Sequence, residues 1–299
     1  MDTMRERFYA VGSELLDEDP KLAVVLADIG TAGFARAAAR HPDRVINVGI
    51  REQLLIGVAS GLALTGFRPI AHSYTPFLVE RPFEQVKLDL GHNDVGAVLV
   101  SIGASYDASG EGRTHQAPED VTLIASLPDW DIHVPGHPDE AEHLLRVATR
   151  SDGRVYVRLA AQSNAAARAV EPGRLHVESR GSGPTVIAVG PVLDRVLDAV
   201  HGLDATVLYA TTVRPFDADT LRAELRSTEI VLVEPYLQGT SSAVVSDAVR
   251  TMPHRLLALG VRRIENRHYG TRDEHDRAHG LDSVGLRRQI EAFLEQPGR

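Results

Sequence analysis

The amino-acid sequence predicts an α/β protein made of two doubly wound domains. Short apolar runs typical of buried strands alternate with helix-like segments from residue 21 to residue 159, and a second such series begins at residue 185. Strands that alternate with helices favour a mainly parallel sheet covered on both faces. A stretch rich in Gly, Pro and Ala separates the two series. We therefore predict domains at residues 1–165 and 185–299, joined by a linker at residues 166–184.

In the first domain, apolar runs predict the strands and helical spacing predicts the helices. Glu52 is expected in the first turn of a helix, because the apolar residues after it recur at helical spacing. These residues are Leu54, Leu55, Val58 and Leu62. Strands are expected at residues 21–27, 45–50, 68–72, 95–102, 132–135 and 155–159, and a glycine-rich loop at 103–116. Other helices are expected at residues 1–16, 34–40, 118–127 and 139–149. Residues 74–83 lead into a further helix that continues to about residue 90.

The second domain repeats the alternation on a smaller scale. Strands are expected at residues 185–189, 206–209, 230–233 and 256–259, with a weak strand at 174–178 inside the connecting stretch. Helices are expected at residues 192–200, 218–225, 241–250 and 283–294. His275 and His279 have the spacing of metal ligands on a helix, but their neighbours are acidic and polar. We interpret this segment as solvated surface, with a metal or partner contact as the alternative.

Composition narrows the class of protein. The chain has 299 residues, of which 43% are hydrophobic and 24% charged, as in a soluble globular protein. The formal net charge of -9 argues against binding to nucleic acid or an anionic membrane. The absence of cysteine excludes disulfides and thiolate metal sites, and it fits a reducing compartment. No secretory signal is visible, and the longest apolar run is too short to span a bilayer, so a cytoplasmic location is expected.

Three stretches carry residues suited to chemistry: N-V-G-I-R-E-Q at 47–53, Y-T-P-F-L at 74–78 and G-E-G-R-T-H-Q at 110–116. Glu52 follows a strand, at the sheet edge where open α/β folds place their ligands. Glu111 and His115 form an acid and base pair on a flexible loop. Phe77 and Phe83 have rings that can flank a flat ligand. Each residue also has a purely structural interpretation. Glu52 can be an acid at a helix start, His115 a loop histidine, and the two phenylalanines can be part of the core. The chain has no P-loop, G-x-G-x-x-G or G-x-S-x-G motif.

Taken together and in this order, the three stretches closely resemble the thiamine-diphosphate enzymes of the transketolase family. The resemblance extends over nearly the whole chain. It includes T-V-R-P-F-D at 212–217, V-E-P at 233–235 and H-G-L-D at 279–282, which are similar to motifs of the family's C-terminal domain. The resemblance implies a pyrimidine-binding domain followed by a transketolase C-terminal-like domain, with thiamine diphosphate as cofactor.

The resemblance assigns cofactor contacts to four residues. Glu52 matches the glutamate that hydrogen-bonds the aminopyrimidine ring and assists removal of a proton from the thiazolium carbon. Phe77 matches the aromatic residue packed on the pyrimidine ring, and Phe83 the second aromatic wall of that pocket. Asp28, in V-L-A-D-I-G, matches an aspartate near the cofactor.

The substrate contacts depart from the family pattern. His115 matches the histidine that bonds the substrate oxygen and moves its proton, and Arg158 falls where an arginine often binds a substrate phosphate. Glu111 lies where transketolases usually carry an aspartate that hydrogen-bonds a hydroxyl group of the donor substrate. Eight positions earlier, where a phosphate-binding histidine is usual, this chain has Gly103. The sugar or sugar phosphate it uses is therefore left open.

The chain also lacks the family's G-D-G…N motif, which holds the diphosphate and its magnesium. The resemblance then implies the small subunit of a split transketolase-like enzyme, which transfers a two-carbon ketol unit from a ketose to an aldehyde. A separate diphosphate-binding chain would hold Mg²⁺ and share thiamine diphosphate in a heterotetramer with two copies of each chain. No metal site is expected in this chain.

Three other functions remain open from the sequence. A 1-deoxyxylulose-5-phosphate-synthase-like enzyme shares the T-H-Q loop but normally carries its diphosphate domain in the same chain. The beta subunit of a 2-oxo acid dehydrogenase is split in the same way but lacks the G-E-G-R-T-H-Q pattern. A non-catalytic assembly subunit could keep this fold, but the retention of Glu52, Phe77 and His115 together argues against it.

Overall fold

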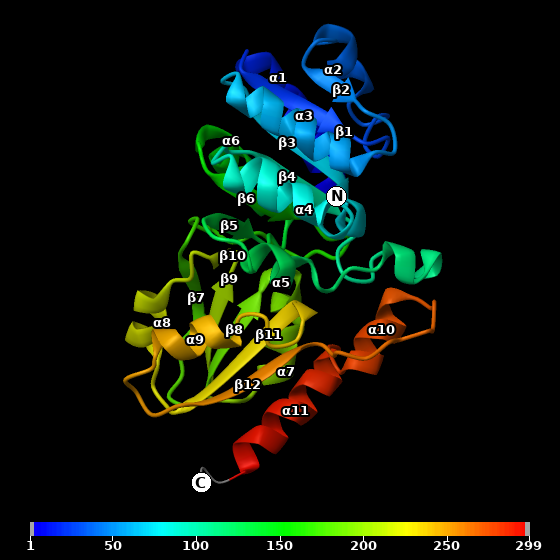
Figure 1. The fold of residues 1–299 in the computed structure, drawn as a ribbon. Helices are drawn as coiled ribbons and strands as arrows, with labels where there is room; N and C mark the ends of the chain where they lie inside the picture. Colours follow the sequence, from blue (N-terminus) through cyan, green and yellow to red (C-terminus); the bar gives the residue numbers. More distant parts are fainter. Residues whose placement is uncertain (1–2, 297–299) are drawn as a thin grey trace.

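The computed structural model describes residues 3–296. It has the predicted class of fold, with two α/β domains one above the other (Figure 1). The first two residues of the predicted first helix lie outside the described part of the chain. Between residues 3 and 296, no helix combines the length and apolar character needed to cross a bilayer.

The first domain is built on a mainly parallel sheet. Its strands run in the order β10-β5-β6-β4-β3-β1-β2, and every pairing except that of β10 is parallel. The strands of the first domain are β1 (Leu22–Leu26), β2 (Val45–Asn47), β3 (Arg68–Tyr74), β4 (Val98–Ile102), β5 (Trp130–His133) and β6 (Arg154–Arg158). β1, β4 and β6 are buried throughout, as expected for strands covered on both faces.

Helices cover both faces of this sheet. One face packs against α1 (Met4–Glu18), α2 (Ala35–Arg40) and α6 (Pro138–Arg150). The other packs against α3 (Glu52–Leu64), η1 (Pro76–Glu80), α4 (Phe83–Gln85), η2 (Val86–His92) and α5 (Asp120–Ala125). Two short 3₁₀ turns, η3 (Ser109–Glu111) and η4 (Arg113–His115), lie in the predicted glycine-rich loop. We call residues 103–116 the His115 loop.

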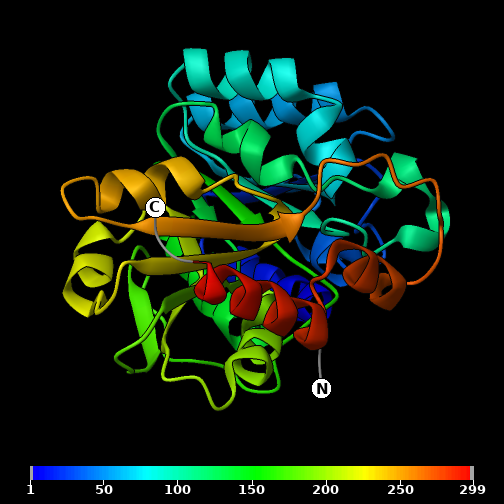
Figure 2. The ribbon, with the colours of Figure 1, turned by 90° about the horizontal axis from the view of Figure 1, so that it is seen from below.

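The second domain has a five-stranded sheet in the order β12-β11-β8-β9-β7. Its strands are β7 (Leu175–Ser179), β8 (Thr185–Val189), β9 (Thr206–Ala210), β11 (Glu229–Leu237) and β12 (Arg255–Val261). Its helices are η5 (Gly190–Val192), α7 (Leu193–Val200), α8 (Ala218–Glu224), α9 (Ser242–Ala248), α10 (Arg272–His279) and α11 (Ser283–Glu295). α7 and α11 cover one face, while α8 and α9 cover the other (Figure 2).

The two domains share a strand. β10 (Thr212–Arg214) follows β9 in the second domain, yet it pairs antiparallel with β5 and becomes the edge strand of the first sheet. A continuous apolar core also extends from the first sheet to β11 and α9. The second domain is therefore joined to the first by main-chain pairing and by buried apolar contacts.

One interpretation from the sequence is wrong. The segment around His275 and His279 is not solvated surface: it forms α10, and His275, Asp276 and His279 are all buried. The polar residues pair with one another and with the first domain, a compensation that a one-dimensional pattern does not reveal. The weak strand expected in the connecting stretch is β7, which pairs with β9.

Glu234, in the V-E-P motif, is a fully buried carboxyl group of β11. The backbone N–H groups of Gly239 and Ser241 donate hydrogen bonds to it, at 3.2 and 3.0 Å. Burial outweighs these bonds and raises the pKa of Glu234 to about 7. The folded chain therefore retains this proton at pH values where the unfolded chain has released it.

We expect the free energy of unfolding to fall as pH rises from about 4.5 to 7, by about 3 kcal/mol from this group. Glu234→Gln keeps one of the two acceptor oxygens and cannot ionise, so its stability relative to the wild type should increase over that interval. Urea unfolding at several pH values measures the difference. The exposed Glu171→Gln is the matched control, and a pH-independent difference for Glu234→Gln would contradict the assigned pKa.

Candidate active site

The residues singled out from the sequence lie at one edge of the first sheet. Asp28 follows β1, Glu52 follows β2, Phe77 follows β3 and the His115 loop follows β4. Because these strands are parallel, their carboxyl ends meet at the same edge. Open α/β sheets bind ligands at this edge.

Glu52 occupies the first position of α3 and is only 1% exposed. Its carboxylate accepts a hydrogen bond from Nη1 of Arg81, at 2.7 Å. The guanidinium carbon of Arg81 also lies 4.2 Å from the centroid of the Phe77 ring. The Arg81 guanidinium is flat, cationic and able to donate hydrogen bonds. The Glu52 carboxylate thus binds its edge while its face packs on the Phe77 ring.

An aminopyrimidine is likewise flat, and it can donate to a carboxylate while it stacks on an aromatic ring. Glu52 and Phe77, which hold the Arg81 guanidinium in this way, have the chemistry to receive the pyrimidine part of thiamine diphosphate. Arg81 was not anticipated from the sequence. Its position four residues after Phe77, on a neighbouring helical turn, is the signal that could have indicated it.

Phe77 also belongs to a cluster of three rings, together with Tyr74 and His115. The Phe77 and His115 ring centroids are 5.1 Å apart, and Tyr74 lies 5.9 Å from His115 and 6.2 Å from Phe77, with interplanar angles of 64–78°. The hydroxyl of Thr114 lies 3.0 Å from Nδ1 of His115. Tyr74 is a second residue that sequence reasoning missed, although it begins the Y-T-P-F-L stretch. The structure thus brings His115 against Phe77, although the two residues are far apart in the chain.

Three of the other residues lie near this edge without joining the cluster. Asp28 is exposed and exchanges hydrogen bonds with Asn47, at 3.0 and 3.1 Å. Glu111 is exposed on the His115 loop. Phe83 begins α4 and is half-buried, and within the described residues it makes no ring contact with Phe77 or His115.

Arg158 lies inside the protein. It is 1% exposed, and its Nε donates to Oδ2 of Asp120 while its Nη2 donates to Oγ of Ser105, both at 2.7 Å. Its guanidinium carbon lies 5.5 Å from the centroid of the Tyr236 ring, in the second domain. Because Arg158 is buried and bonded inside the protein, a phosphate has no access to it in this structure. We therefore leave Arg158 out of the substrate site.

A small cavity of about 170 Å³ lies next to the ring cluster. It is lined by Arg5, Tyr74, Gly103, Asp107 and Leu159 among others, and Arg5 is the one basic residue of the described chain on its wall. Gly103 has a φ of +76°, and a Cβ there would lie 2.3 Å from the Tyr74 ring. Tyr74 therefore fills the space that a side chain at position 103 would need, which excludes a histidine there.

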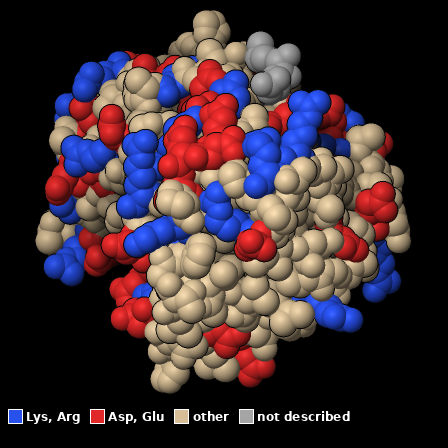
Figure 3. Space-filling view, turned by 90° about the horizontal axis from the view of Figure 1, so that it is seen from above, with Lys and Arg blue, Asp and Glu red and all other residues tan. Residues whose placement is uncertain are grey.

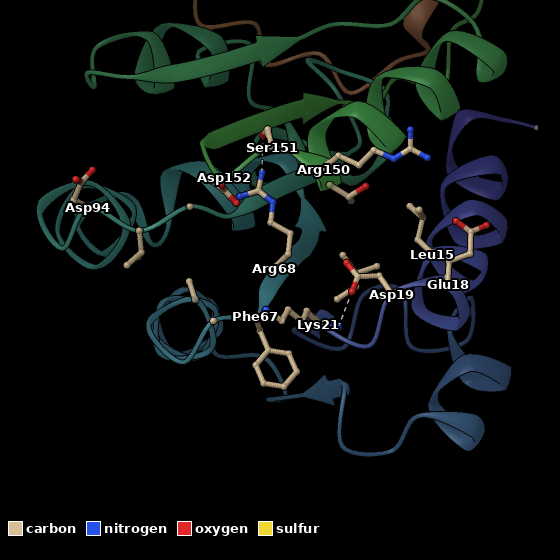
Figure 4. Close-up of a pocket in the computed structure, with 16 residues that line it drawn as sticks. Leu15, Glu18, Asp19, Lys21, Phe67, Arg68, Asp94, Arg150, Ser151 and Asp152 are labelled. Carbon is tan, nitrogen blue, oxygen red and sulfur yellow. Dashed lines mark hydrogen bonds between the residues drawn. The ribbon is translucent and has the colours of Figure 1, made fainter.

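A larger cavity, of about 680 Å³, is at the opposite edge of the sheet, where β1, β3, β4 and β6 begin (Figure 4). Arg68 points into this region, and its guanidinium donates to the carbonyl oxygens of Ala148 and Gly153. Burial lowers the pKa of Arg68 to about 10. Acidic and basic side chains alternate around this cavity, and none of the residues at the carboxyl edge lines it.

Within residues 3–296, no three His, Asp or Glu side chains are grouped in a way that could hold a metal ion.

Comparison with known proteins identifies the fold of the first domain. Residues 2–165 match the family described as "Transketolase, pyrimidine binding domain", which covers more than half of the chain. The chain therefore belongs to the transketolase family through its pyrimidine-binding domain, and a domain of this kind implies binding of thiamine diphosphate.

The relatives include both split and full-length enzymes. An uncharacterised 33.6 kDa protein in the fasciation locus of Rhodococcoides fascians is 54% identical over 286 residues, covering 94% of this chain and 92% of that one. One subunit of the apulose-4-phosphate transketolase of Actinobacillus succinogenes is 28% identical, covering 95% and 94%. The 1-deoxy-D-xylulose-5-phosphate synthase of Thioalkalivibrio sulfidiphilus is also 28% identical, but this chain spans only 45% of its length.

Solved structures agree with this grouping. A structure described as split gene transketolase, inactive beta4 tetramer, superposes with a TM-score of 0.86 at 26% identity. The superposition covers 98% of this chain and 98% of that one. The transketolase of Campylobacter jejuni superposes with a TM-score of 0.78 at 17% identity, over 97% of this chain and 46% of that one, and it shows the fold alone.

Proposed function

We propose that this chain is the C-terminal-half subunit of a split transketolase-like enzyme, which transfers a two-carbon ketol unit from a ketose or ketose phosphate to an aldehyde. The observation that carries the proposal is the cluster of Glu52, Phe77 and His115 at the carboxyl edge of a pyrimidine-binding domain. A buried carboxylate, a stacking ring and a proton-transferring imidazole are the groups that thiamine-dependent ketol transfer requires from this half.

We assign roles to these residues from their places at this edge of the sheet. Glu52, buried at the start of α3, hydrogen-bonds the aminopyrimidine after Arg81 has moved aside, and Phe77 holds the ring flat. Thiamine diphosphate, when bound, supplies the carbon nucleophile and accepts the electron pair released by bond cleavage. His115 donates to the substrate oxygen and carries its proton, with Tyr74 beside it.

Substrate recognition is assigned to the rim of the same site. Glu111 is exposed on the His115 loop and accepts hydrogen bonds from donor hydroxyl groups. Arg5 lines the small cavity beside Tyr74 and is available to an anionic or hydroxylated end of the substrate. Asp28 and Phe83 remain candidates for the outer wall of the cofactor site.

A second chain completes the cofactor site. This chain has no G-D-G motif, so Mg²⁺ and the diphosphate are assigned to a diphosphate-binding partner. The subunit names of the relatives support such a division. We propose a heterotetramer of two chains of each kind, with the cofactor between them.

The outer face of α3 supports this assembly. Ile50, just before the helix, and Leu54 and Leu64 on it are 46–71% exposed, and Leu88 of η2 is 43% exposed next to it. Gly57 and Gly61 lie on the same helix, yet a Cβ at Gly61 would meet nothing within 4 Å and one at Gly57 only the side chain of Asp89 at 3.6 Å. Glycine destabilises a helix interior unless close contact requires it, so these positions favour approach by another chain. Figure 3 shows this side, in the lower half of the view, as largely uncharged.

A deoxyxylulose-phosphate-synthase-like reaction is the second candidate, because the synthases match this chain at the same identity as the transketolase subunit. The assembled enzyme would distinguish the two: with pyruvate as donor the synthase reaction releases CO₂, whereas ketol transfer from a ketose does not.

Isothermal titration calorimetry tests the division of the cofactor site. We expect no tight binding of thiamine diphosphate to the chain alone, and stoichiometric Mg²⁺-dependent binding once the diphosphate-binding chain is added. Arg81→Ala in the isolated chain is the control, because it removes the group that covers Glu52 but adds no diphosphate ligands. Tight binding by the wild-type chain alone would rule out the split arrangement, and tight binding by Arg81→Ala alone would show that Arg81, not a missing partner, prevents it.

A further inference from the structure

We propose that residues 265–276 of the second domain, which we call the clasp, hold the His115 loop in its reactive position, and that Tyr269 and Arg272 are positioning residues for His115. The inference rests on the proposed function. The clasp leaves β12, crosses to the first domain and returns as α10, and both ribbon views show it next to the His115 loop (Figures 1 and 2).

Buried and half-buried polar bonds join the clasp to the loop, besides a longer, exposed contact of 3.7 Å between Nε of Arg113 and Oε2 of Glu265. The phenol of Tyr106 donates to Oδ1 of Asp276 at 2.5 Å, and Oγ of Ser109 donates to the carbonyl oxygen of Gly270 at 2.9 Å. Nη2 of Arg272 lies 3.0 Å from Oδ1 of Asp107. Tyr106, Asp276 and Ser109 are each no more than 6% exposed. Bonds of this kind are stronger away from water, so they restrain the loop along much of its length.

Ring stacking between Tyr106 and His275 also joins the loop to the clasp. The Tyr106 ring lies on His275, with centroids 4.9 Å apart and planes at 19°. Nε2 of His275 is 2.9 Å from the carbonyl oxygen of Tyr269, so it carries the proton, and Nδ1 accepts from the side-chain amide of Asn266 at 3.2 Å. His275 therefore ties the loop residue Tyr106 to the main chain of the clasp.

Tyr269 contacts the loop close to His115. Gly112 has a φ of +77°, and a Cβ at this position would lie 2.5 Å from the Tyr269 ring. The ring therefore rests directly on the backbone three residues before His115. Tyr269 is 60% exposed, so its ring contributes little to a core. Its packing on Gly112 is best explained as a restraint on the loop.

The loop needs such a restraint. It contains two short 3₁₀ turns and three glycines, and by itself a segment of this kind samples many conformations. His115 must keep its place against Phe77 to reach a substrate oxygen, and a displacement of about 1 Å of a catalytic group can lower a rate by about 100-fold. The second domain, which supplies none of the clustered residues, thus has a role in the reaction through the clasp.

The test compares Tyr269→Ala with Tyr269→Phe, and Arg272→Ala serves as a second variant. Arg180→Ala, which removes an exposed side chain paired with Glu224 of the same domain, is the control. Amide hydrogen exchange of the isolated chain should be faster in residues 105–116 by about tenfold in the two clasp variants, and unchanged in Tyr269→Phe and the control. In the enzyme assembled with its partner, kcat should fall by about tenfold or more while the Kd for thiamine diphosphate is unchanged, because Glu52 and Phe77 are not touched.

Unchanged exchange in both clasp variants would overturn the proposal, as would faster exchange with undiminished kcat. Recovery of slow exchange and of kcat in Tyr269→Phe identifies the ring, not the hydroxyl, as the restraint. If the wild-type assembly shows no ketol transfer, that result counts against the proposed function, and exchange in the isolated chain still decides whether the clasp holds the loop.

Discussion

Replacing Glu52 by glutamine is expected to lower turnover of the assembled enzyme by about 100-fold or more. Glu52 is 1% exposed at the start of α3, with only Arg81 bonded to its side chain among the described residues. Glutamine has nearly the same size and still accepts a hydrogen bond, but it cannot share a proton with the aminopyrimidine. The loss should therefore appear in kcat, measured at saturating cofactor and substrates.

Glu84→Gln is the matched control, because Glu84 also lies in a first helical turn of this domain but is exposed. Its turnover should equal that of the wild type. Thermal unfolding of Glu52→Gln should stay within a few degrees of the wild type, which separates a chemical effect from a folding defect. Near-normal turnover of a folded Glu52→Gln complex would remove Glu52 from the reaction.

Replacing Asp120 by alanine is expected to lower the free energy of unfolding by about 3–5 kcal/mol. Asp120, the first residue of α5, is fully buried and accepts hydrogen bonds from Arg158 and from the phenol of Tyr156, both at 2.7 Å. Without the carboxylate, the Arg158 guanidinium remains buried without its hydrogen-bonded counter-charge. Urea unfolding followed by the fluorescence of Trp130, the single tryptophan, measures the loss.

The double variant Asp120→Ala/Arg158→Met provides the control. It removes the buried Arg158 charge together with the Asp120 carboxylate, so it should be more stable than Asp120→Ala alone. By comparison, Arg180→Ala removes an exposed arginine from its pair with Glu224 and should cost less than about 1 kcal/mol. If Asp120→Ala unfolds no more easily than Arg180→Ala, Arg158 has another partner, and a substrate role for it would have to be considered again.

Much of the candidate site could be predicted from the sequence because its residues sit on short, ordered motifs. Glu52 and Phe77 come a few residues after strands whose apolar runs are visible in the chain, and parallel strands bring such positions to one edge. Arg158 shows the limit of this reasoning. It occupies the position expected of a phosphate ligand, yet Asp120 and Ser105, 38 and 53 residues earlier in the chain, hold it inside. Ion pairs between distant residues leave no local pattern.

The sequence alone determined the alternation of strands and helices, the carboxyl-edge position of Glu52, and the absence of a diphosphate motif, because each depends on neighbouring residues. Only the tertiary structure decided that Arg81 covers Glu52, that β10 joins the first sheet, and that the polar segment around His275 is a buried helix. The physical reason is the same in each case. The polar groups of these segments find their partners in residues remote in the chain, and folding alone brings those partners within hydrogen-bonding distance.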